Sequence, residues 1–86
     1  MINTYGIEFD EDWPKCFGAL DKSLRLRIAK KIGKILVTPY KRHLRKLSYF
    51  VDQVGQYRIV YKIFEEKKIV KFYFIGDHKE YEKWYK

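Results

Sequence analysis

Two strand-like runs near the end of this sequence lie so close together that they constrain the fold more than any other feature. The runs are QYRIVYKIF (56–64) and KIVKFYFI (68–75), and both are rich in the β-branched and aromatic residues typical of strands. The residues EEKK mark the junction between them. We therefore predict an antiparallel hairpin over residues 56–75.

The alternation within the first of these runs predicts the face on which each side chain lies. Successive residues of a strand point to opposite sides of the sheet. One set is expected in the core, and the other set projects from the opposite face. The core set is Tyr57, Ile59, Tyr61 and Ile63, and the opposite set is Arg58, Val60, Lys62 and Phe64.

Two helices are predicted before the hairpin. A short one follows Asp12, a candidate N-cap, and carries Pro14 in its first turn, where proline is tolerated. A longer one spans residues 21–36, where apolar residues recur at helical spacing and basic residues occupy the rest of the surface. Pro39 then ends the helix, because proline cannot continue it.

The remaining segments complete the predicted order of elements. Residues 4–9 are expected to form a first strand, residues 44–51 another strand and residues 52–56 a turn, with a short helix capped by Asp77 at the end. The order β-α-α-β-β-β with a short C-terminal helix predicts an α+β fold. In this fold, two N-terminal helices pack on one face of a small antiparallel sheet.

Length and composition limit the class of protein. We expect the 86 residues to form a single domain, residues 1–86. The single cysteine, Cys16, excludes an internal disulfide and a cysteine-rich metal site, and two isolated histidines argue against structural zinc. We find no 18-residue apolar run and no signal-peptide pattern, so we expect a cytoplasmic protein without a membrane partner, a metal or another cofactor.

The positive charge is concentrated in one part of the chain. Residues 22–51 contain ten Lys and Arg residues and no Asp or Glu, within a protein of net charge +8. A segment of this kind produces a positive field that attracts polyanions. It predicts binding to nucleic acid or a ribonucleoprotein, or alternatively to an acidic protein.

Three residues near the hairpin are candidates for chemistry. Arg58 projects from the face opposite the core, where a guanidinium can bind phosphate, although a salt bridge to a nearby glutamate is the simpler interpretation. His78 follows the last strand and is able to accept or donate a proton near neutral pH. Tyr81 lies three residues further, on the same helical face, where it would stack on a base or close the core together with Trp84.

A basic segment precedes the hairpin. YKRHLRKL (40–47) places cations beside Tyr40 and Tyr49, a combination that suits single-stranded RNA because cations bind phosphates and rings stack on bases. The predicted RNA-binding residues are Lys41, Arg42, His43, Arg45 and Lys46.

Taken together, VGQYRIVYKI and the later FIGDHKEYEK resemble the RelE/ParE superfamily of type II toxins, and the resemblance covers the whole chain. It implies a RelE-like toxin, a metal-independent endoribonuclease that cuts mRNA in the ribosomal A site and inhibits translation. The strand arginine of the family corresponds to Arg58 of this chain, and the functional residue after the last strand corresponds to His78. The tyrosine that follows corresponds to Tyr81, and Trp84 is the alternative for this position. The resemblance implies three partners: mRNA, the ribosome and a cognate, acidic antitoxin. It also implies that the toxin is a monomer and forms oligomers only with the antitoxin.

The sequence departs from the family pattern in one place. Active members often carry basic residues on the strand before Arg58, whereas this chain has Val51 and Gln53 there. Two alternatives therefore stay open, a ParE-like poison of a DNA topoisomerase and a catalytically inactive relative that binds RNA or a partner.

Overall fold

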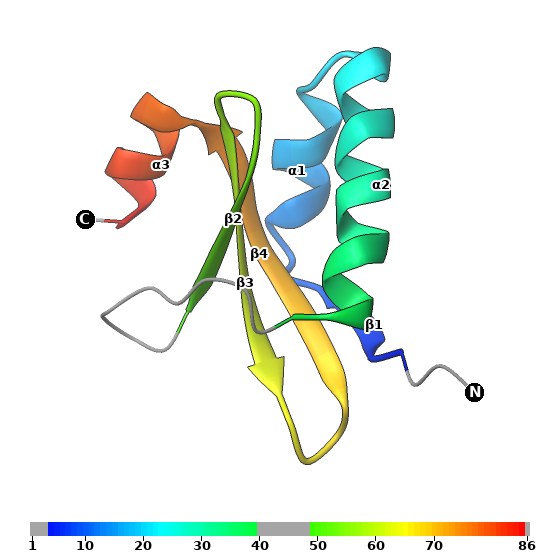
Figure 1. Ribbon diagram of the computed structural model, residues 1–86. Helices are drawn as coiled ribbons and strands as arrows, with labels where there is room; N and C mark the ends of the chain where they lie inside the picture. Colours follow the sequence, from blue (N-terminus) through cyan, green and yellow to red (C-terminus); the bar gives the residue numbers. More distant parts are fainter. Residues whose placement is uncertain (1–3, 40–48, 86) are drawn as a thin grey trace.

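The computed structural model describes residues 4–39 and 49–85, in which three helices and four strands are found (Figure 1). The order of elements is the predicted one. The bounds are β1 Gly6–Phe9, α1 Trp13–Gly18, α2 Lys22–Val37, β2 Phe50–Val54, β3 Tyr57–Phe64, β4 Ile69–Asp77 and α3 His78–Tyr85.

The four strands form one sheet in the order β1-β4-β3-β2. The predicted hairpin is present, since β3 pairs antiparallel with β4, and β2 adds to it antiparallel. The first strand differs from a purely antiparallel arrangement because β1 pairs parallel with β4. Both helices lie between β1 and β2 in the chain, and a long crossover of this kind allows parallel strands. The α+β class is therefore confirmed, with a mixed sheet.

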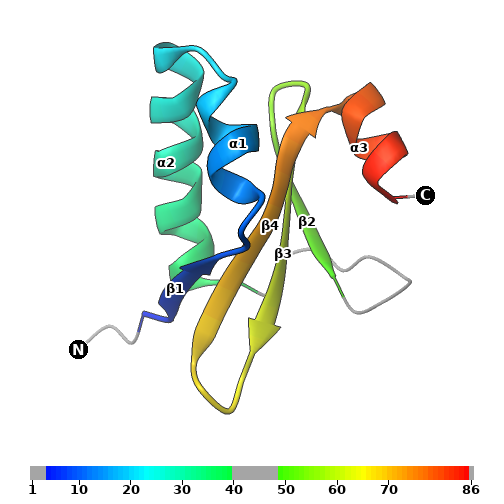
Figure 2. The same ribbon diagram turned by 180° about the vertical axis from the view of Figure 1, so that it is seen from behind.

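The helices lie on both sides of this sheet. Figures 1 and 2 show α1 and α2 side by side on one face, as predicted, and α3 at one end of the opposite face. The chain enters α2 through Asp21, whose side-chain Oδ1 accepts a hydrogen bond of 2.8 Å from the backbone N–H of Leu24. Asp12 occupies the predicted N-cap position of α1 but makes no capping hydrogen bond through its side chain.

The core between the helices and the sheet follows the predicted alternation of β3. Ile59 and Tyr61 are fully buried and pack with Ile28 of α2 and Phe72 of β4. Val60 is also fully buried, although it belongs to the opposite face. That face is therefore apolar around Val60, while Arg58 and Lys62 on either side of it are partly exposed.

The boundaries of β2 differ from the prediction. The strand continues through Asp52 to Val54, so the turn is shorter than expected and begins at Gly55, which has a φ of +59°. Asp52 is tolerated because its Oδ1 lies 3.5 Å from Nζ of Lys31 in α2, and this ion pair overrides the low strand propensity of Asp. Residues 44–48 of the predicted strand lie outside the described residues.

The register of the hairpin contains an irregularity that the sequence did not reveal. Val60 pairs with Phe74 but Tyr61 pairs with Phe72, so Tyr73 is an extra residue in β4. As a result Arg58 lies opposite Gly76, whereas a regular hairpin placed it close to residue 74. This shift moves Arg58 toward the end of β4, where α3 begins.

Candidate functional site

The candidate site lies where β4 passes into α3, on the face of the sheet opposite α1 and α2. Arg58 occupies this face near the start of β3, and its cross-strand partner Gly76 precedes His78 by only two residues. The hairpin therefore brings together residues that are twenty positions apart in the chain.

The position of His78 is fixed by reciprocal capping at the start of α3. The backbone N–H of Glu80 donates to Oδ1 of Asp77, and the N–H of Asp77 donates to Oε1 of Glu80, both at 2.9 Å. This arrangement is a capping box, which satisfies two donors that a helix end leaves without partners. Because the helix starts directly after Asp77, His78 lies in its first turn.

Gly76 allows the chain to turn this closely. A Cβ atom at this position would lie 2.6 Å from Cζ of Phe74 and 3.1 Å from Cβ of Glu80. The Phe74 ring has little freedom to move away, since Phe74 is 9% exposed and its ring stacks on Trp84 at 5.5 Å. The absence of a side chain at Gly76 is therefore a condition for the placement of α3.

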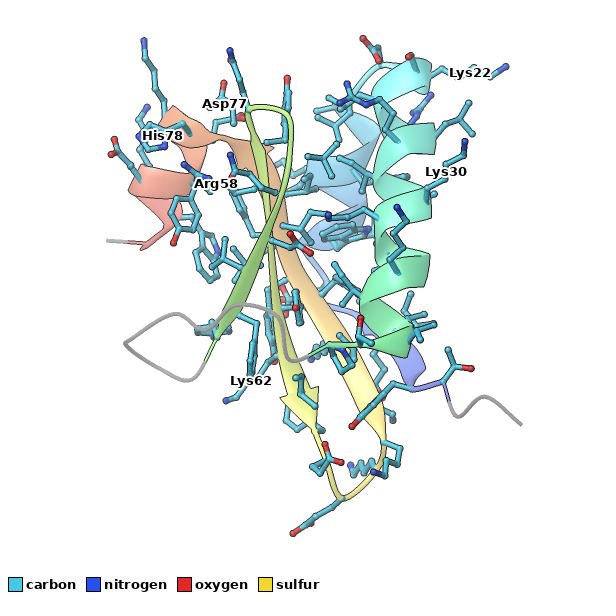
Figure 3. The ribbon with its side chains drawn as sticks, viewed as in Figure 1. Lys22, Lys30, Arg58, Lys62, Asp77 and His78 are labelled. Atoms are coloured by element: carbon cyan, nitrogen blue, oxygen red, sulfur yellow. The ribbon has the colours of Figure 1, made fainter. Side chains whose placement is uncertain are left out.

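The structure brings together the three side chains that the sequence singled out for chemistry. Nη2 of Arg58 lies 3.2 Å from Nδ1 of His78, as Figure 3 shows for the two labelled residues. The Arg58 guanidinium also lies over the ring of Tyr81, 5.7 Å from its centroid. A cation, a group able to transfer a proton and a phenol therefore share one exposed surface.

A fourth side chain, which the sequence analysis did not single out for this site, joins this group. Oε2 of Glu82 lies 3.2 Å from Nε2 of His78, and the two side chains are 59% and 58% exposed. The spacing of four residues along α3 places them on the same helical face. The i, i+4 spacing of His and Glu was the signal available in the sequence.

The two candidate aromatic residues of α3 have different surroundings. Tyr81 contacts Arg58, whereas Trp84 stacks on Phe74 and meets the ring of Tyr49 edge-on at 5.4 Å. Trp84 therefore attaches α3 to the sheet, and Tyr81 is the aromatic residue that faces the candidate site.

The strand next to Arg58 contributes no charge to this face. Gln53 pairs with Arg58 and Val51 pairs with Val60, so both point to the same side of the sheet as Arg58. Cations come instead from Lys62 of β3 and Lys71 of β4, which face each other across the hairpin. Lys62 projects from the sheet well below Arg58 in Figure 3.

The same face contains a tyrosine with a perturbed pKa. Burial raises the pKa of Tyr73, and the nearby Tyr49, Asp10 and Glu8 act in the same direction. A tyrosine is already neutral near pH 7, and the raised pKa makes the phenol of Tyr73 a still weaker acid. His78 is the better candidate for proton transfer.

Other predictions fall outside the described part of the chain, or concern features that this part lacks. The predicted RNA-binding residues Lys41, Arg42, His43, Arg45 and Lys46 belong to residues 40–48, which are not described. Within residues 4–39 and 49–85 there is no cluster of three His, Cys, Asp or Glu side chains that would hold a metal ion. No helix in this part of the chain is long and apolar enough to cross a membrane.

Comparison with solved structures identifies clear relatives in fold. The chain superposes on a chain of the intact E. coli RelBE toxin–antitoxin complex with a TM-score of 0.80 and 27% identity, covering 85% of this chain and 95% of that one. For a doubly substituted E. coli RelE toxin in the free state, the TM-score is 0.83 and the identity 25%. The match covers 96% of this chain and 93% of that one. For the RelBE2 complex of Mycobacterium tuberculosis, the TM-score is 0.77 and the identity 20%. The match covers 88% of this chain and 100% of that one.

These similarities confirm the resemblance found in the sequence, because the chain is RelE-like over nearly its whole length. No protein-family model matches the sequence, and no curated protein matches it either. The three-dimensional structure therefore reveals a relationship that those comparisons of sequence do not.

Proposed function

We propose that this chain, which has the fold of the RelE toxins, is the toxin of a toxin–antitoxin system and inhibits translation by cleaving ribosome-bound mRNA. The observation that carries the proposal is the 3.2 Å contact between Arg58 and His78 on an exposed face. This contact places a permanent cation beside a proton-transfer group, which are the two components that metal-independent RNA cleavage needs.

The proposed reaction uses the neighbouring 2′-hydroxyl of the RNA as nucleophile. His78 accepts the proton of this hydroxyl while its oxygen forms a bond to the phosphorus, and the bond from phosphorus to the 5′-oxygen breaks. The leaving 5′-oxygen takes a proton from water, which gives a 2′,3′-cyclic phosphate and a 5′-hydroxyl. Arg58 binds the phosphate oxygens, whose negative charge grows in the transition state, and Tyr81 positions the substrate.

The exposure of the site favours a substrate held by another particle. His78 is 58% exposed, so the described residues around it do not enclose an RNA chain. Orientation is a large part of catalysis, and the ribosome would supply it by holding the mRNA in a fixed path. We therefore expect much slower cleavage of free RNA than of ribosome-bound mRNA.

An acidic antitoxin is the proposed protein partner. Two of the three structures compared above are toxin–antitoxin complexes, and segment 22–51 of this chain has ten Lys and Arg residues and no Asp or Glu, a charge that would attract such a protein. Co-expression with the neighbouring reading frame, followed by mass measurement of the purified complex, tests this. A monomeric protein that does not bind the product of this reading frame would contradict the proposed partner.

Binding without cleavage is a second candidate function. The uncharged Gln53 opposite Arg58 and Val51 beside it favour this alternative, because the β2 side of the site supplies no cation to a phosphate. An inactive relative would bind RNA or an antitoxin but leave the RNA intact.

Expression in a bacterial host separates these functions. The rates of translation and DNA synthesis are measured after induction of the wild type, Arg58→Ala and His78→Ala. We expect translation to stop first with the wild type and to continue with both variants. Lys67→Ala and Lys79→Ala are matched controls, since each removes an exposed side chain, from the far end of the hairpin and from α3 respectively.

Two results would contradict the proposal. If growth arrest persists with both site variants, the nuclease mechanism is wrong. If DNA synthesis stops before translation, a ParE-like activity on a topoisomerase replaces it.

A further inference from the structure

Both ring nitrogens of His78 have a polar neighbour. Nη2 of Arg58 lies 3.2 Å from Nδ1, and Oε2 of Glu82 lies 3.2 Å from Nε2. Arg58 comes from β3 and Glu82 from α3, so two separate elements hold the imidazole from opposite sides.

The chemistry of these neighbours determines which nitrogen carries the proton. A guanidinium only donates hydrogen bonds and an ionised carboxylate only accepts them. Nδ1 must therefore offer its lone pair to Arg58, and Nε2 must carry the hydrogen that points to Glu82. Both contacts select the same neutral tautomer, in which Nε2 carries the hydrogen.

We propose that Glu82 is a positioning residue, which acts through His78 and makes Nδ1 the atom that accepts the proton of the RNA hydroxyl. This inference rests on the proposed function. When a scissile phosphate draws the Arg58 guanidinium away, the lone pair of Nδ1 becomes available beside that phosphate. Glu82 continues to hold Nε2–H, and its charge stabilises the imidazolium that forms on proton uptake. Glu82 itself does not touch the RNA.

The first measurement reads the tautomer without any enzymatic assay. Nitrogen NMR of ¹⁵N-histidine-labelled protein distinguishes a bare ring nitrogen from a protonated one, and His43→Asn in all samples leaves only the signals of His78. The comparison is made between Arg58→Ala and Arg58→Ala/Glu82→Ala, because Arg58 would otherwise hold the same tautomer. We expect the double variant to contain a larger share of the Nδ1–H form than the single variant.

The second measurement is cleavage of a ribosome-bound mRNA of defined sequence. Glu82→Ala is expected to lower kcat by on the order of tenfold with an unchanged KM, since the substrate does not contact Glu82. Glu82→Gln keeps an oxygen that accepts a hydrogen bond but has no charge, so its kcat is expected to fall less than that of Glu82→Ala. Glu66→Ala, an exposed glutamate in the turn of the hairpin, is the matched control and should cleave like the wild type.

The results separate this inference from the function on which it rests. Equal tautomer populations in the two NMR samples, or a wild-type kcat for Glu82→Ala, would overturn the role of Glu82. Absence of cleavage by the wild type would overturn the proposed function and with it the catalytic use of Glu82. In that case the NMR comparison would still decide whether Glu82 orients the ring.

Discussion

Arg58 lies directly opposite Gly76 across the β3–β4 ladder, and this pairing places the guanidinium beside the first turn of α3. The lack of a side chain at Gly76 lets α3 start close to the strand, and α3 carries His78 to Arg58. The register of the sheet and the start of the helix are thus linked at a single position.

Gly76→Ala is expected to displace α3 and to reduce both stability and activity. The added Cβ would meet the Phe74 ring at 2.6 Å, and overpacking of this kind costs about 1–3 kcal/mol. Urea denaturation gives the free energy of unfolding, and the rate of translation after induction in the bacterial host gives the activity. Gly33→Ala in α2 is the control, since its Cβ would meet nothing within 4 Å and should stabilise the helix by about 0.5–1 kcal/mol. Equal stability of the two variants would contradict the argument.

Tyr81→Phe and Tyr81→Leu distinguish the ring from the hydroxyl. If Tyr81 acts through the aromatic face that Arg58 contacts at 5.7 Å, Phe keeps the interaction and Leu removes it. An exposed cation–π contact contributes about 0.5–1 kcal/mol, so Leu should reduce kcat/KM by roughly two- to fivefold. Kinetics on ribosome-bound mRNA provide the measurement. An equal loss with Phe and with Leu would show that the hydroxyl is the active part.

The ion pair between Lys31 and Asp52 predicts unequal effects of removing either partner. Asp52 is 5% exposed and its Oδ2 has no hydrogen-bond partner among the described residues, whereas the Lys31 side chain is 22% exposed. Lys31→Met leaves a buried carboxylate without its ion-pair partner and should cost about 3 kcal/mol, while Asp52→Asn should cost about 1–2 kcal/mol. The double variant is expected to cost less than the sum. Chemical denaturation of the three variants measures these values, and additive costs would show that the pair is not coupled.

Tyr61 predicts a loss of stability in alkaline solution. Its hydroxyl donates a 2.6 Å hydrogen bond to the carbonyl oxygen of Pro39. Burial, followed by the charge of Asp52, raises the pKa of Tyr61 above its ordinary value near 10. The unfolded chain therefore releases this proton at a lower pH than the folded protein does. The stabilisation is complete below about pH 10 and is lost as the pH rises further.

Tyr61→Phe tests this prediction. At pH 8 the unfolding free energy of the variant should be about 1 kcal/mol lower than that of the wild type, because the hydrogen bond is missing. Above about pH 10 the stability of the variant should fall less steeply than that of the wild type. Unfolding free energies at pH 8, 10 and 11 provide the comparison. Tyr73→Phe is a suitable reference, since the pKa of Tyr73 is raised in the same direction but its ring is only half-buried. Parallel pH curves for wild type and Tyr61→Phe would contradict the assignment.

The sequence predicted those parts of the structure that depend on local pattern. The short junction between residues 64 and 69 was enough to expect the hairpin, and with it the approach of Arg58 to His78. Alternation along β3 assigned Ile59 and Tyr61 to the core because one face of the sheet must be buried.

The remaining features depend on contacts between distant residues. The extra residue Tyr73 in β4 changes the register, and no local property of the segment KFYFI distinguishes a bulge from a regular strand. The length of β2 depends on the pairing of Asp52 with a lysine twenty-one positions earlier. The parallel pairing of β1 depends on the path of two helices. The sequence offered Glu82 only as one possible salt-bridge partner of Arg58. Its contact with His78 was not predicted, because a glutamate on a helix surface is common and the contact matters only once Arg58 lies at the other ring nitrogen.

The small size of α3 has a consequence for the lifetime of the site. An eight-residue helix is too short to persist alone in water, so α3 depends on its capping box and on the packing of Trp84 against Phe74. Its amides should therefore exchange hydrogen through local opening, at a free energy well below that of global unfolding. Each such opening separates His78 from Arg58 while the sheet stays folded. The fraction of molecules in which His78 contacts Arg58 is thus set by the docking of α3 onto the sheet. The free energy of global unfolding does not measure this fraction.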